Sequence, residues 1–188
     1  MDKINKDDQL DLFQVRLEDE LLKLCTSLGV LEGGWLMTPD LEEKWREVAP
    51  EYMADAVKEV NSYPEVALAW AGYLGMGYAH LWDSNWRKHS RDGYSKMLGS
   101  RGFDDMDEHI VRDILGYSLD SFDAIKLSGV LNSCAQCAWG LIRKESIEGA
   151  TEKAFYVLAR TMQIMYCVGV SIELKRLGYK YEKLEQFS

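Results

Sequence analysis

The feature that most constrains the fold is a stretch of seventeen residues, 66–82, that contains no side chain with a fixed charge. Placed at about 100° per residue, its apolar side chains point in every direction and leave no wide polar arc. A helix that is apolar on all sides is the buried centre of a bundle. The sequence therefore predicts a central helix over residues 63–86, with other helices packed around it.

Three glycines lie inside this predicted helix, at Gly72, Gly75 and Gly77. Each glycine costs about 1 kcal/mol of helix propensity relative to alanine. Glycine inside a helical pattern often has a packing reason, because a residue without a side chain lets a neighbouring backbone come close. We therefore expect other helices to approach the central helix closely at these positions.

Helical periodicity recurs along the rest of the chain. Only three prolines occur in 188 residues, so few breaks are obligatory and long helices are favoured over a strand-and-turn protein. The further predicted helices cover residues 8–28, 39–48, 103–115, 120–144 and 151–177. Pro50 is expected either to kink the helix that starts at residue 39 or to begin a new helix through residue 60.

Capping residues support several of these boundaries. Thr38 is a favourable N-cap followed directly by a proline, which is common in the first turn of a helix. Ser62 and Glu65 have the spacing of a capping box. Asp120 is expected to cap the helix that follows it, and residues 87–102 are predicted to form a polar loop.

The predicted fold class is all-α. The length suits one domain, and the short connection between the last two helices makes them antiparallel neighbours. We therefore predict a single helical domain over residues 1–188, a bundle of six or seven helices with a buried central helix and a C-terminal antiparallel αα-hairpin. Residues 1–7 and 179–188 are expected to be frayed.

The net charge of −9 limits the classes of partner. Nucleic-acid binding needs a basic surface that releases counterions, and anionic membrane surfaces attract basic segments. Both are therefore excluded as expected partners, whereas a basic protein partner is compatible with the charge. The uncharged stretch 66–82 is short for a membrane span, and the mean hydropathy of the chain is −0.27, so we interpret the stretch as core.

The N-terminal residues contain no apolar segment of signal-peptide length. Four cysteines in such a chain are interpreted as reduced thiols, and a cytoplasmic location is expected. Cys134 and Cys137 have the spacing of a redox motif, but they fall more than three turns inside a predicted helix with no preceding strand. Buried structural cysteines are the favoured interpretation.

No metal site and no cofactor are expected. His109 lies on one helix face with Asp105 and Asp113, and we interpret that ladder as a charged surface. The chain contains no Glu-x-x-His pair, which excludes a di-iron bundle. Trp45, at a helix margin, is expected to seal the end of the bundle rather than to dock a partner.

His80 is the position where a function is most conceivable, because it belongs to the helix predicted to be buried. Asp83, Tyr73 and Tyr78 lie near it in the sequence. A buried imidazole needs a hydrogen-bond partner, and Asp83, a tyrosine hydroxyl or a backbone carbonyl is the expected one. A satisfied core histidine is the favoured interpretation. The same arrangement would also serve as a general base or ligand clamp.

The sequence contains no motif that names a reaction, so a non-catalytic helical binding or interaction protein is the preferred functional interpretation. The alternative is a small-molecule-binding enzyme with an inter-helix pocket around His80 and Asp83. The amphipathic helix over residues 8–28 could pack on its own bundle or on a second copy, and we expect a homodimer because two-fold dimers are the commonest soluble oligomers.

Overall fold

The computed structural model describes residues 6–145 and 151–181 and confirms the all-α bundle. Of the described residues, 76% are helical, and they form no sheet, only an isolated bridge between Gly99 and Gly102. The α-helices in this part of the chain are α1 (Lys6–Ser27), α2 (Pro39–Ala56), α3 (Pro64–His89), α4 (Met106–His109), α5 (Phe122–Lys144) and α6 (Glu152–Arg176). Three single turns of other helix types, η1 (Val57–Glu59), η2 (Tyr94–Met97) and η3 (Ile110–Ile114), lie between them.

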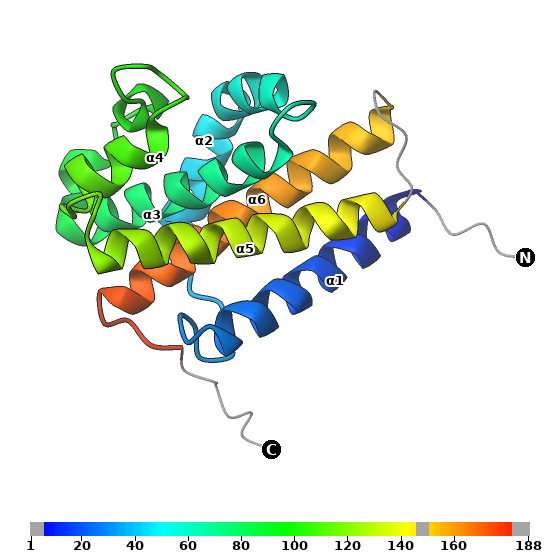
Figure 1. Ribbon diagram of the computed structural model, residues 1–188, viewed down its shortest axis with the longest axis horizontal. Coiled ribbons are helices and arrows are strands. Elements are labelled where there is room, and N and C mark those ends of the chain that lie inside the picture. Colours follow the sequence, from blue (N-terminus) through cyan, green and yellow to red (C-terminus); the bar gives the residue numbers. More distant parts are fainter. Residues whose placement is uncertain (1–5, 146–150, 182–188) are drawn as a thin grey trace, which may run out of the picture.

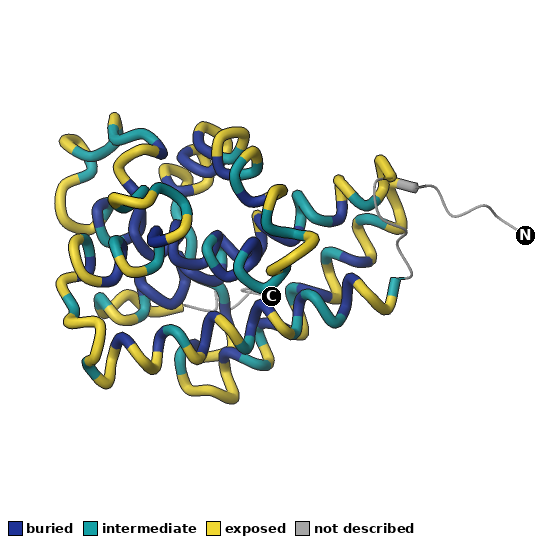
Figure 2. The backbone as a smooth tube through the Cα atoms, turned by 45° about the horizontal axis from the view of Figure 1, so that its top comes forward, coloured by how far each residue is buried: buried dark blue, intermediate teal, exposed yellow. Residues whose placement is uncertain are grey.

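The helices α5 and α6 run antiparallel, as predicted, and α1 lies beside them (Figure 1). One end of this three-helix group extends beyond the remainder of the molecule (Figures 1 and 2). The central helix α3 packs chiefly against α6, and α2 contacts both. The predicted central helix is therefore confirmed, with α6 as its main partner.

Glycines bring α3 and α6 into backbone contact. A Cβ atom added to Gly169 of α6 would lie 1.8 Å from the carbonyl oxygen of Gly72. A Cβ atom added to Gly75 would lie 2.1 Å from the carbonyl oxygen of Tyr166. The expected close approach is confirmed at Gly72 and Gly75. Gly77 instead faces the side chain of Met97, so no second backbone approaches it.

Two predicted capping residues were wrong by one position. Helix α3 begins after Tyr63, which forms no side-chain cap, so Ser62 lies one residue too early to bond to the first turn. Helix α5 is capped by Ser121, whose hydroxyl accepts a hydrogen bond from the amide of Ala124, and Asp120 lies outside the helix. The N-cap at Thr38 is confirmed, since its hydroxyl accepts from the amide of Leu41 at 3.1 Å.

Helix α3 is longer than predicted and takes in residues 87–89. Its backbone leaves the helical region at Asn85, where φ is −167° and ψ is 87°, and helical turns then continue to His89. A buried lysine on α2, Lys44, holds this end of the helix. Its ammonium group donates to the carbonyl oxygens of Ser90 at 2.8 Å and Asp92 at 3.2 Å.

The apolar face of α1 packs against other helices of the same chain. Phe13, Leu17 and Leu21 are buried in the same core as α5 and α6. The surface on which the expectation of a homodimer was based is therefore covered within one copy. Residues 1–5 and 182–188 of the ends expected to fray lie outside the described residues, whereas Tyr181 packs its ring on Gly34.

Within the described residues, α6 is the one helix that is long and apolar enough to cross a membrane. Of its most apolar window, 61% is buried against the other helices. The core helix of a water-soluble bundle passes the same test, so the finding is weak support for a membrane span. Helix α3, which contains the uncharged stretch 66–82, does not meet the criterion.

We predict that Gly169→Ala lowers the free energy of unfolding by about 3 kcal/mol, because the new methyl group forces two backbones apart. For a domain of this size the midpoint of thermal unfolding should fall by roughly 6–12 °C. The matched control is Gly129→Ala on α5, where a Cβ would meet nothing within 4 Å. That variant should gain up to about 1 kcal/mol from helix propensity. Equal effects of the two variants in calorimetry would contradict the proposed backbone contact.

Candidate functional site

His80 lies on α3 and points at a buried carboxylate on α6. Its Nδ1 atom is 3.1 Å from Oε1 of Glu173. The side chain of Glu173 is fully buried, and that of His80 is 29% exposed. The predicted partners of His80 were therefore wrong, because the partner comes from a helix 93 residues away in the sequence, and the predicted burial was too high.

Arg176, one turn further along α6, neutralises Glu173. Its Nε donates to Oε2 at 2.8 Å and its Nη2 to Oε1 at 3.0 Å. A further guanidinium nitrogen donates to the hydroxyl of Tyr117. Partial burial lowers the pKa of Arg176, but the hydrogen bonds to Glu173 and Tyr117 outweigh it and raise that pKa overall. The carboxylate thus has a permanent positive partner.

This arrangement fixes the hydrogen on the His80 ring. An ionised carboxylate only accepts hydrogen bonds, so the Nδ1 atom that faces Glu173 carries a hydrogen. In the neutral imidazole the Nε2 atom then holds a free lone pair, and no described residue lies within hydrogen-bond distance of it. A histidine held by a carboxylate at one nitrogen and open at the other has the geometry of an oriented base.

The other predicted site residues do not converge on His80. Asp83 accepts a hydrogen bond from the hydroxyl of Tyr179 at 2.8 Å. Tyr73 is buried, with its ring edge against Trp70, and burial raises the pKa of its hydroxyl to about 12. Asp83 therefore joins α3 to the segment that follows α6, and Tyr73 packs against a residue of its own helix, so the predicted set of four is not a single site.

Tyr78 is buried beneath α2. The Nζ atom of Lys44 lies 5.6 Å from the centre of its ring. Its hydroxyl has no hydrogen-bond partner among the described residues, and burial raises its pKa above the ordinary value. Tyr78 thus belongs to the packing between α2 and α3.

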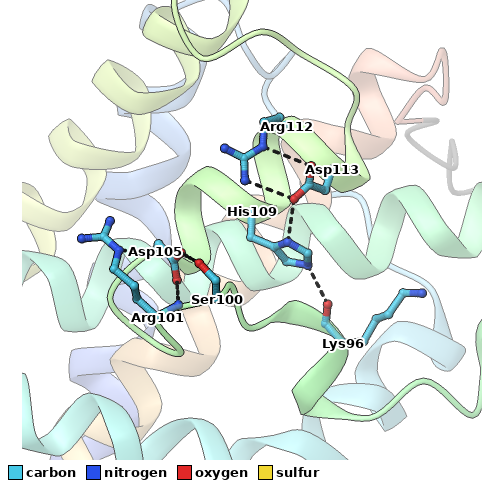
Figure 3. A network of polar contacts seen from close by, with 7 residues as sticks. All are labelled: Lys96, Ser100, Arg101, Asp105, His109, Arg112 and Asp113. Atoms are coloured by element: carbon cyan, nitrogen blue, oxygen red, sulfur yellow. Dashed lines mark hydrogen bonds and ion pairs between the residues drawn. The ribbon is translucent and has the colours of Figure 1, made fainter.

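The three residues of the His109 ladder do not form one cluster: His109 contacts Asp113, whereas Asp105 contacts a different segment (Figure 3). The ring of His109 lies 2.9 Å from Asp113 through Nδ1 and 3.0 Å from the carbonyl oxygen of Lys96 through Nε2. The carboxylate of Asp105 instead accepts from the amide of Arg101 at 3.1 Å and fills the space beside Gly99. No group of three potential metal-binding side chains comes together in residues 6–145 and 151–181.

The nearest sulfur neighbour of Cys134 is Cys25 on α1, and not Cys137 of the sequence motif. The Sγ atom of Cys134 lies 3.6 Å from that of Cys25 on α1, and both side chains are buried. Cys137 is half-buried, so the prediction of burial was wrong for it. Burial raises the pKa of the Cys137 thiol, and raises that of Cys167 to about 12. These two thiols are therefore poor nucleophiles at neutral pH.

A groove between α2 and α6 is a candidate binding surface that the sequence did not predict. It has a volume of about 790 Å³. Phe155 and Val57 remain 50% and 43% exposed in it. The residues that line this α2–α6 groove are Trp45, Arg46, Ala49, Pro50, Met53, Ala54, Val57, Phe155 and Gln163.

The floor of the α2–α6 groove is packed against the core. Trp45 is 6% exposed and packs against Tyr166 of α6 with ring centres 5.0 Å apart. It also packs against Tyr52 at 6.0 Å. Trp45 is thus a packed core residue, as expected, but it lies inside α2 and not at a helix margin. Its outer edge forms part of the groove.

Acidic residues flank the groove along α2. This helix carries six acidic and two basic residues, a net charge of −4. Glu43, Glu47 and Glu51 are exposed, and each lies three residues before a residue that lines the groove, which makes them neighbours on the helix surface. Glu47 pairs with Lys44. Glu43 and Glu51 form no ion pair within the described residues. Arg46, which lines the groove, contributes one positive charge, so the α2 side of the groove carries a net negative charge.

We predict that the neutral imidazole of His80 carries its hydrogen on Nδ1, the less common tautomer in free histidine. Nitrogen-15 NMR of the ring at a pH where it is neutral measures this directly. Asp83→Asn should leave the tautomer unchanged, because Asp83 bonds to Tyr179. Glu173→Ala should remove the preference and lower the free energy of unfolding by about 1.5–3 kcal/mol, the contribution of charged hydrogen bonds. A hydrogen on Nε2 in the unmodified protein would contradict this geometry.

Comparisons with models of known families, with characterised proteins and with solved structures found no match for this chain. What the protein does must therefore be inferred from its own residues.

Proposed function

We propose that this protein is a non-catalytic binding protein whose α2–α6 groove holds a segment of a partner protein. The observation that carries the proposal is the groove itself, an apolar channel in which Phe155 and Val57 stay about half exposed. Fully burying such a side chain is worth about 1.5–3 kcal/mol. A partner that covered the channel would gain part of that free energy at each position.

The groove is formed before any partner arrives. Its two walls are helices joined by the packing of Trp45 on Tyr166, and the hydroxyl of Tyr166 also donates to the carbonyl oxygen of Leu41 at 2.8 Å. Because these walls are fixed, a partner does not have to order them. A preformed surface lowers the free-energy cost of association.

The proposal predicts contact between a partner and position 155 in the cell. A photo-crosslinking amino acid placed at Phe155 should give a discrete protein adduct on illumination. The matched control is the same amino acid at Phe122, which is 79% exposed on α5 and lies outside the groove. Adding Met53→Glu to the Phe155 version should reduce the adduct at least tenfold. No adduct at position 155, or equal adducts at both positions, would contradict the proposal.

A second candidate function rests on His80. Its imidazole, held by Glu173 and open at Nε2, would suit a small-molecule-binding enzyme in which His80 acts as a general base. Neither His80 nor Asp83 lines the α2–α6 groove, so the two candidates involve different parts of the surface.

The second candidate is tested by His80→Ala. Glu173 keeps both hydrogen bonds from Arg176 in this variant, and a functional histidine contributes little to stability. The free energy of unfolding measured in urea should then change by less than about 0.5 kcal/mol. A loss of about 1–3 kcal/mol would identify a structural histidine and remove the support for an enzyme.

A further inference from the structure

The partner segment for the α2–α6 groove can be specified further, and this step rests on the proposed function. We infer that the groove takes a basic amphipathic helix of another protein. Three features of the groove carry the inference: the type of backbone that its walls can accept, the length of its apolar stripe and the charges along its rim.

The walls of the groove favour a helix over an extended peptide. Both walls are helices, whose backbone groups are already bonded along their own axes. An extended peptide needs backbone donors and acceptors from its receptor, as a strand does at a sheet edge. A helix satisfies its own backbone and binds through side chains alone. The groove therefore accepts a helix without leaving backbone groups unpaired.

The apolar stripe has the length of a short helix. It runs along α2 from Trp45 to Val57, which is about 18 Å at 1.5 Å per residue. Ala49 and Met53 lie between them at intervals of four residues, one helical turn apart. A partner helix of about 12 residues, with apolar side chains on one face, matches this stripe in length.

The rim selects a basic partner. Exposed carboxylates at Glu43 and Glu51 lie beside the stripe and form no ion pair within the described residues. A positively charged flank on the partner would meet them, whereas an acidic flank would be repelled. A second copy of this chain would place its own acidic α2 there in a symmetric dimer, so like charges disfavour it.

The test uses the purified full chain and three fluorescent peptides of about 12 residues in an anisotropy titration. The first is an amphipathic helix with leucines on one face and lysines beside them, and the second replaces the lysines by glutamates. The third has the composition of the first in an order that destroys the apolar face. We expect the first peptide to bind at least tenfold more tightly than either of the others. Its affinity should also fall as salt is raised.

Charge reversal in the protein gives the matched variants. The double variant Glu43→Lys with Glu51→Lys should lower the affinity for the basic peptide at least tenfold and raise the affinity for the acidic one. The control pair, Glu20→Lys with Asp123→Lys, makes the same change in net charge at exposed positions on α1 and α5. It should alter the affinity for the basic peptide less than threefold. An equal loss in both pairs would overturn the inference, because only net charge would then matter.

Three further outcomes would also overturn the inference. One is equal or tighter binding of the acidic peptide, another is no binding of the basic peptide, and the last is a dimer in light scattering that Met53→Glu dissociates. None of these results alters the photo-crosslinking at position 155. If the adduct at position 155 forms but the peptide results go against the inference, the groove still binds a partner and only the proposed type of partner is wrong. If the adduct is absent, the groove is not a binding surface.

Discussion

The contact between the backbones of α3 and α6 is the constraint on which the other packing depends. Gly72 and Gly169 let the two helices touch, which a side chain at Gly169 would prevent. The close approach places Glu173 of α6 within hydrogen-bond distance of His80 on α3. It also fixes α6 at the depth where Tyr166 supports Trp45. The His80 site and the floor of the α2–α6 groove therefore depend on the same few atoms of helix backbone.

The two candidate sites differ in how their costly groups are treated. Around His80 a buried carboxylate is neutralised by Arg176, and burial of an unpaired charge would otherwise be costly. In the α2–α6 groove the helices instead leave apolar atoms of Phe155 and Val57 in water. A folded chain gains nothing from such exposure. A partner that covers those atoms would account for it.

The fold was predictable because local pattern determines it, and the candidate site was not because it depends on pairs far apart in sequence. The apolar stretch 66–82 and the cap at Thr38 carried enough information to locate helices. The partner of His80 lies 93 residues away, and no periodicity reveals which face of α6 turns toward α3. The groove was missed for the same reason, since Val57 and Phe155 come together only after α2 packs on α6.

The order of synthesis gives the glycine contact a further consequence. Gly72 leaves the ribosome about 100 residues before Gly169, an interval on the order of 5–20 s at ordinary rates of translation. Throughout it, the helix that is apolar on every side has no α6 to cover it. The nascent chain can then cover α3 only with the segments already made, which are α1, α2 and later α5, or with a chaperone. The contact between α3 and α6 cannot form until α6 is made, so premature release of the chain before α6 would leave part of the apolar surface of α3 uncovered and favour aggregation.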